Sequence, residues 1–260
     1  YGCLVGSEMC IRDRFKIVKM EITELQKDLA ATFRWTVRLN MHEAVANHFS
    51  ACVPGSSDFY VNKAGIHFSQ IKASDLILIT KENIEELRNK PEVVDSTALN
   101  IHGTIHEKAP HAKCIFHLHS KYATVLSTLK DPTIKPIDQN TMFFYNRVAV
   151  YNDFGGLGFE EESIKMANAL GNKQHMILAN HGIITTGETV AEGFNSLYYF
   201  EKAAETYITA LSTNKNLNIV SHVVAEKTCE EAANYPVDTA KQFLSQIRLI
   251  LDKEEPEYVN

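Results

Sequence analysis

The stretch Lys-Cys-Ile-Phe-His-Leu-His at residues 113–119 constrains the fold of this chain more than any other feature. The run is rich in residues that favour a β-strand, and side chains on a strand alternate between the two faces of a sheet. His117 and His119 are therefore expected to point the same way, while Leu118 points into the opposite layer. Two imidazoles on one face make half of a metal site.

A third histidine, His181, ends a second apolar run at residues 175–180 and precedes Gly182, which allows the backbone to turn closely. Three neutral imidazoles around Zn²⁺ or a similar divalent ion leave one coordination position open, as catalytic sites do. The alternative is that His117 and His119 are ordinary histidines on a half-buried strand. The candidate metal ligands are thus His117, His119 and His181.

Composition narrows the classes of function. At 260 residues and 45% hydrophobic content, without a linker or repeat, the chain is expected to form one large domain. A net charge of −6 and scattered basic residues argue against nucleic acid and membrane surfaces as partners. Five dispersed cysteines, with no Cys-x-x-Cys pair, favour reduced thiols in the cytoplasm.

The first residues look foreign to the fold. Residues 1–14 lack periodicity and resemble a translated sequencing adapter, so residues 1–19 are interpreted as a non-native or disordered leader, with Met20 as a natural start. Residues 20–225 are expected to form the main domain, and residues 226–260 a helical tail packed on it.

The rest of the chain reads as mixed α and β. Helices are expected at residues 21–40, 98–108, 121–129, 159–170, 188–211 and 230–251, and strands at 48–53, 59–62, 76–80, 113–119, 148–151, 176–179 and 183–185. In the helix at 188–211, the apolar stripe of Phe194, Leu197, Tyr198 and Phe200 is interpreted as core or subunit contact.

Two motifs carry a resemblance to a known family. The run Ile-His-Glu-Lys-Ala-Pro-His-Ala-Lys-Cys-Ile-Phe-His-Leu-His at 105–119, with Tyr-Ala-Thr at 122–124, and the run Asn-His-Gly-Ile-Ile-Thr-Thr-Gly at 180–187 resemble the class II aldolase/adducin family. Segments 47–50, 64–65, 73–76, 136–140, 250–252 and 256–258 resemble its adducin-like bacterial branch. The resemblance implies a three-layer α/β/α fold around a mixed, mainly antiparallel sheet. It also implies a divalent metal, zinc being favoured, on His117, His119 and His181, and a homotetramer.

The chain also departs from the family pattern. Family aldolases carry Pro-Ser-Ser-Glu where residues 95–98 read Asp-Ser-Thr-Ala, and the methyl group of Ala98 cannot transfer a proton. Replacements for that acid/base could be Asp95, His102, Glu107, Asp138 or Tyr145, although each could equally be a cap, a surface charge or a packed ring. The residues that match the family's phosphate-binding group are His48, Gly65, Ser96 and Thr97, with Ala64 in place of a threonine. A substrate with or without phosphate is therefore allowed.

Three hypotheses follow for the function. The first is a metal-dependent, aldolase-like lyase acting on a small sugar-like hydroxy-carbonyl compound through a metal-stabilised enediolate. The second is a decarboxylase or a 4-epimerase of the same family, and decarboxylation of a β-keto acid needs no base to form the enediolate. The third is a non-catalytic, adducin-like interaction module of the actin or cytoskeleton type. Three convergent imidazoles favour an enzyme, because a scaffold does not need them.

Overall fold

The computed structural model describes residues 22–153, 155–159 and 161–260. The expected leader at residues 1–19, the start at Met20 and two of the five cysteines, Cys3 and Cys10, lie outside this part. The other three cysteines, Cys52, Cys114 and Cys229, are free thiols. No helix in the described part is both long and apolar enough to cross a bilayer.

A seven-stranded sheet forms the centre of the described chain, in the order β3-β2-β1-β4-β7-β6-β5. The strands are β1 (His48–Cys52), β2 (Phe59–Asn62), β3 (Leu76–Ile79), β4 (Cys114–Leu118), β5 (Val148–Tyr151), β6 (His175–Leu178) and β7 (Gly182–Gly187). Neighbouring strands pair antiparallel, except that β5 and β6 run parallel. The expected mixed, mainly antiparallel sheet is confirmed.

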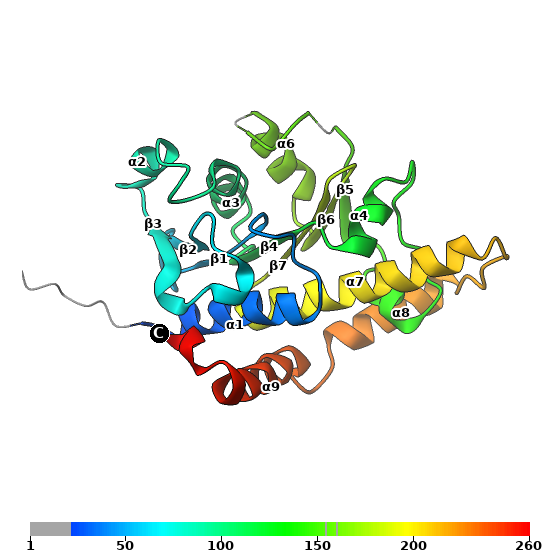
Figure 1. The fold of residues 1–260 in the computed structure, drawn as a ribbon. Helices are drawn as coiled ribbons and strands as arrows, with labels where there is room; N and C mark the ends of the chain where they lie inside the picture. Colours follow the sequence, from blue (N-terminus) through cyan, green and yellow to red (C-terminus); the bar gives the residue numbers. More distant parts are fainter. Residues whose placement is uncertain (1–21, 154, 160) are drawn as a thin grey trace, which may run out of the picture.

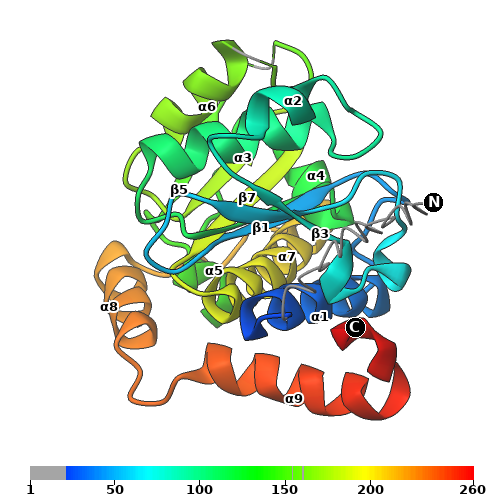
Figure 2. The same ribbon diagram turned by 90° about the vertical axis from the view of Figure 1, so that its left-hand side faces the viewer.

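Helices cover both faces of this sheet, as Figures 1 and 2 show. One face carries α2 (Ile84–Arg88), α3 (Ser96–Lys108) and α6 (Glu161–Leu170). The other face carries α1 (Glu24–Arg38), α4 (Lys121–Ser127), α5 (Gln139–Phe143) and α7 (Val190–Ser212). Outside this second layer lie α8 (His222–Ala233) and α9 (Thr239–Glu254). Short 3-10 helices occupy Phe68–Gln70, Ala73–Asp75 and Pro256–Val259. The three-layer α/β/α architecture is therefore confirmed.

Alternation along β4 separates its side chains as the sequence predicted. Phe116 and Leu118 are fully buried in the core on the α1 and α7 side, whereas Ile115 belongs to a cluster on the α3 and α6 side. Phe49, on the neighbouring strand β1, stacks on Phe33 of α1 with ring centroids 4.6 Å apart. Since His117 shares the face of Ile115, it points away from this aromatic layer and toward α3.

One predicted helix was wrong. Residues 230–251 were expected to form a single helix, but α8 ends at Ala233 and α9 begins at Thr239. Pro236 lies in the break, where it lacks an amide hydrogen and restricts the conformation of Tyr235. The five-residue helices α2 and α5 were not predicted, because one turn is too short to show a helical period.

The apolar stripe of α7 belongs to the core. Phe194, Leu197 and Phe200 are at most 1% exposed, and α7 packs against β7, α4 and α9. This face is therefore already covered by the chain itself. Of the two interpretations, core and subunit contact, the core is the one that Phe194, Leu197 and Phe200 fulfil, and an oligomer requires another surface.

The C-terminal residues pack back onto the first helix (Figure 2). Helix α9 contacts α1 and α7, and Arg248 binds Asp28 at 2.6 Å. Arg34 of α1 binds Glu255 and Glu257, each at 3.1 Å. These long-range ion pairs join the two ends of the described chain.

Candidate metal centre

Two neighbouring antiparallel strands bring the three histidines together. Leu118, the last residue of β4, pairs with Ile183 near the start of β7. His119 and His181 therefore lie just beyond the same end of these two neighbouring strands. A Cβ atom on Gly182 would lie 2.4 Å from the carbonyl oxygen of Leu118, so only glycine fits beside β4. Gly182 is itself the first residue of β7, directly after a turn at residues 179–181, and what requires glycine there is the close approach to the neighbouring backbone.

The nitrogen atoms of His117, His119 and His181 converge within 4.8 Å of one another. The Nδ1 atom of His117 donates to the carbonyl of Ile183 at 2.9 Å, and Nδ1 of His119 donates to Glu43 Oε2 at 2.5 Å. In neutral rings both Nε2 atoms then carry lone pairs, and these face each other at 3.2 Å. Two ligand nitrogens of a tetrahedral zinc ion lie about 3.3 Å apart. The arrangement therefore fits a bound cation.

Burial favours the neutral form of His117 and His181. Desolvation, with smaller contributions from neighbouring histidines, lowers the pKa of His117 well below its ordinary value. The pKa of His181 is lowered to about 4, mainly by burial and then by His119, against the opposing effect of Glu162 and Glu43. A divalent metal binds the neutral form of imidazole, so both shifts favour metal binding near neutral pH.

Glu43 is a site residue that the sequence did not reveal. It lies 76 positions before His119, in the loop between α1 and β1, and no spacing pattern connects the two. A carboxylate that accepts from the second nitrogen of a ligand histidine fixes the tautomer of that histidine and raises the basicity of its metal-binding nitrogen. Ligand histidines generally have such a partner, so one could be expected for His119. That rule alone does not identify Glu43.

Replacing Glu43 by glutamine is expected to weaken zinc binding by about 10- to 100-fold, the usual effect of losing a partner of this kind. Glutamine keeps an oxygen acceptor but lacks the charge that stabilises His119. Competition with a chromophoric chelator measures the affinity. A matched Glu85→Gln variant, which alters an exposed side chain near Arg88, should bind zinc as the parent does. Equal zinc affinity in the Glu43→Gln variant and the parent would exclude this role.

The predicted substrate-binding residues lie in neighbouring segments. His48 pairs with His117 across β1 and β4, and their ring centroids are 5.0 Å apart. The Nε2 atom of His48 lies 3.2 Å from the hydroxyl of Thr97 in the first turn of α3, which begins at Ser96. Gly65 follows β2 with a positive φ of 73°.

The proposed replacements for the missing acid/base have varied surroundings. Asp138 caps α5 through the amide of Thr141 at 2.9 Å, and the hydroxyl of Tyr145 lies 3.1 Å from His222 on α8. Asp95 caps α3, Glu107 is exposed, and His102 is fully buried between His48 and Ser50. The partners of Asp138 and Tyr145 thus lie on α5 and α8, whereas Asp95 and His102 are linked to His48 and Thr97.

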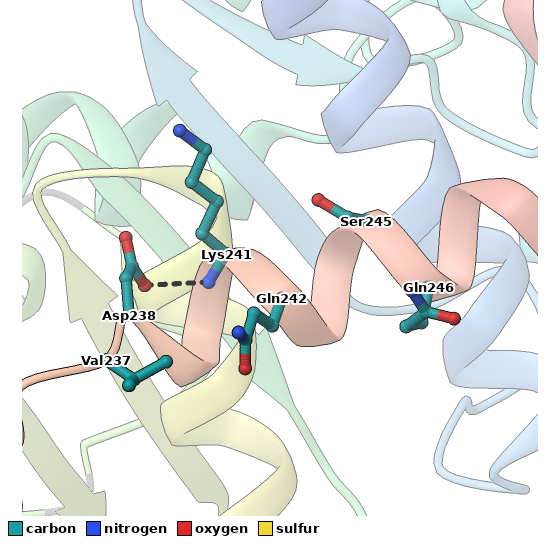
Figure 3. Close-up of a pocket in the computed structure, with 6 residues that line it drawn as sticks. All are labelled: Val237, Asp238, Lys241, Gln242, Ser245 and Gln246. Atoms are coloured by element: carbon teal, nitrogen blue, oxygen red, sulfur yellow. Dashed lines mark hydrogen bonds between the residues drawn. The ribbon is translucent and has the colours of Figure 1, made fainter.

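Two further cavities lie against α9. A cavity of about 960 Å³ is bordered by α1, β1, α7 and α9, including Lys113, Lys241 and Arg248. A smaller one of about 490 Å³ surrounds the start of α9, where the Asp238 carboxylate accepts the Lys241 amide (Figure 3). None of His117, His119 and His181 lines either cavity. The predicted metal ligands therefore lie away from both cavities.

The profile of the family Class II Aldolase and Adducin N-terminal domain matches residues 27–208, more than half of the chain. The chain belongs to this family. A Pseudomonas aeruginosa protein described as aldolase class 2 is 28% identical over 191 residues, 73% of each chain. Human beta-adducin is 28% identical over 157 residues, which are 60% of this chain but 21% of that protein.

Solved structures of the class II aldolase and adducin family share the fold. An aldolase II superfamily protein from Pseudomonas syringae superimposes with a TM-score of 0.81 at 27% identity, over 95% of this chain and 98% of that one. An L-fuculose 1-phosphate aldolase from Glaciozyma antarctica gives 0.76 at 26% identity, over 91% and 92%. Because aldolases and adducins both match, membership alone does not select a reaction.

Proposed function

We propose that this chain is a divalent-metal-dependent lyase that acts on a small, sugar-like hydroxy-carbonyl substrate, with zinc held by His117, His119 and His181. The observation that carries the proposal is the pair of Nε2 atoms facing each other at 3.2 Å, each on a ring whose Nδ1 is held by a fixed acceptor. A scaffold has no physical need for such an arrangement.

The residues of the chain would act in three ways. Ile183 and Glu43 orient the rings of His117 and His119, so that little reorganisation is needed when the metal binds. When bound, the metal would polarise the substrate carbonyl as a Lewis acid. His48 and Thr97, on the same side of the sheet as His117, would contact the far end of a short substrate.

The test compares zinc-loaded with metal-free protein on ketoses, their phosphate esters and β-keto acids. Aldehyde release reports retro-aldol cleavage, and carbon dioxide release reports decarboxylation. We expect carbon–carbon cleavage only in the zinc-loaded protein. Full zinc occupancy without cleavage of any of these compounds would instead support the adducin-like interaction module.

Decarboxylation is the second candidate, because the structure places Ala98 in an apolar environment. Ala98 is 1% exposed and belongs to a cluster with Phe59, Val61 and Leu99. A proton-transferring side chain is therefore missing where family aldolases have their glutamate. Release of carbon dioxide needs no such group, since the breaking bond itself supplies the electrons.

Replacing Ala98 by glutamate should create or raise retro-aldol activity only if the carboxylate can leave this cluster toward the histidines. Burying a carboxylate among apolar side chains is expected to lower the free energy of unfolding by about 3 kcal/mol. Urea unfolding measures this cost, and an Ala98→Gln variant separates the effect of size from that of charge. A folded, zinc-loaded Ala98→Glu variant without aldehyde release would favour the decarboxylase.

We also propose a homo-oligomer, and a tetramer is expected from the family. Exposed apolar side chains on and beside α8 and α9 offer a surface, among them Val223 at 74%, Tyr235 at 62% and Leu249 at 54% exposed. Light scattering at micromolar concentration should give four times the mass of the chain. A stable monomer under these conditions would exclude the tetramer.

A further inference from the structure

A chain of hydrogen bonds runs from the start of α3 into the protein behind the three histidines. It begins at Thr97 Oγ1, 3.2 Å from His48 Nε2, and continues from His48 Nδ1 to His102 Nε2 at 2.7 Å. The next contacts are His102 Nδ1 to Ser50 Oγ at 2.5 Å, Ser50 Oγ to His106 Nε2 at 2.8 Å, and His106 Nδ1 to the Ala112 carbonyl at 2.7 Å. We call this series the histidine chain. None of its members is one of the three proposed metal ligands.

The far end of the histidine chain fixes the direction of every hydrogen bond when each ring carries one proton. The carbonyl of Ala112 can only accept, so His106 carries its proton on Nδ1 and accepts at Nε2 from the hydroxyl of Ser50. Cys52 Sγ, 3.2 Å from the same Nδ1, is only a weak partner. The direction of the hydrogen bonds at this end is therefore set by the backbone carbonyl of Ala112, which cannot become a donor.

The hydrogen bonds between Ser50 and His48 follow the same donor-to-acceptor direction. Because the hydroxyl hydrogen of Ser50 is donated to His106, the Ser50 oxygen accepts from Nδ1 of His102. Nε2 of His102 then accepts from Nδ1 of His48. Nε2 of His48 is left without a proton. It presents a lone pair toward Thr97, at the start of α3.

Asp95 adds a second acceptor at this place. Its Oδ1 accepts from the amide of Thr97 at 2.7 Å, from the amide of Ala98 at 3.4 Å and from the hydroxyl of Thr97. We call Asp95, Thr97 and His48 the acceptor corner. A helix N-terminus ordinarily attracts anions through its free amides. Here the Asp95 carboxylate already accepts from the amides of Thr97 and Ala98. The hydroxyl of Thr97 has a single hydrogen, which faces two acceptors, Asp95 Oδ1 and His48 Nε2.

Such a corner favours a hydrogen-bond donor over an anion. A phosphate group needs free donors and would lie against the negative charge of Asp95. A substrate hydroxyl, in contrast, supplies the missing hydrogen to His48 or Asp95. We propose that the acceptor corner binds a hydroxyl group of an unphosphorylated substrate and discriminates against phosphate esters, with Asp95 as the specificity-determining residue. This inference rests on the proposed function and names its substrate class.

The test uses a pair of probes that differ only by phosphate, dihydroxyacetone and dihydroxyacetone phosphate, titrated into zinc-loaded protein by calorimetry. The parent should bind the phosphate ester no more tightly than the free compound. Asp95→Asn keeps a good N-cap while removing the charge, and it should raise affinity for the ester at least tenfold. Asp238→Asn, the matched change at the start of α9, should leave both affinities unchanged.

Tighter binding of the ester than of dihydroxyacetone by the parent, by tenfold or more, would overturn the inference and leave the proposed lyase intact. Loss of zinc binding altogether would instead count against the proposed function. Nitrogen NMR of histidine-labelled protein gives a reading that is independent of the probes. It should find His48 protonated at Nδ1 and not at Nε2, and the reverse tautomer would contradict the inference. A Ser50→Ala variant should abolish this preference.

Discussion

Replacing His117 by alanine is expected to weaken zinc binding on the order of 1,000-fold or more and to remove any zinc-dependent cleavage. His117 is 2% exposed, and it is the only one of the three histidines that lies within a strand. With its ring gone, His119 and His181 provide two nitrogens, and a two-ligand site competes poorly with water for a divalent ion. Isothermal titration with zinc, at a pH where the parent is saturated, measures the loss.

A matched control is available in the turn between α3 and β4. His111 lies outside the cluster and donates to the carbonyl of Lys173 at 2.9 Å, so a His111→Ala variant should keep the parent's zinc affinity. Thermal unfolding without metal shows whether His117→Ala is folded. A folded His117→Ala variant with undiminished zinc affinity would mean that the metal binds elsewhere.

Replacing Glu201 by leucine should lower the free energy of unfolding by about 3 to 4 kcal/mol. Glu201 lies on α7 and is 7% exposed, and its carboxylate accepts at the start of α4. The donors are the hydroxyl of Ser120 at 2.7 Å and the amides of Tyr122 at 2.9 Å and Ala123 at 3.0 Å. Leucine would leave these three donors without a partner, next to the positive end of the helix dipole.

The consequence extends to the metal centre, because Ser120 directly follows His119. Urea unfolding measures stability, and the zinc affinity of the folded fraction should fall as His119 loses its fixed position. Glu205→Gln, one turn further along α7 and paired with Lys202 only at the surface, is the matched control and should change stability by less than about 1 kcal/mol. Similar effects of the two changes would exclude an anchoring role for Glu201.

The sequence predicted the sheet and its metal-facing side well, because these depend on short-range patterns. Alternation in residues 113–119 was enough to place Phe116 and Leu118 in one layer and His117 in the other. The glycine at position 182 was associated with a close turn, and the turn lies just before it, at residues 179–181. The structure adds the reason, which is the Leu118 carbonyl of the adjacent strand.

Contacts between distant segments could not be predicted in this way. Glu43, Glu201 and the histidine chain depend on which loops and helices meet over the sheet, and neither periodicity nor spacing encodes that. Asp95 illustrates the limit. The sequence offered it as a cap or as an acid/base, and only the fold shows its carboxylate bound to the Thr97 amide and hydroxyl beside His48.

The most direct test of the account is the zinc K-edge X-ray absorption spectrum of the purified protein, taken together with its zinc content. We predict one zinc per chain, with three imidazole nitrogens at about 2.0 Å and one further light-atom ligand. In the His117→Ala variant this signal should be absent. A spectrum with sulfur ligands at about 2.3 Å, or protein that takes up no divalent metal at all, would contradict the three-histidine centre.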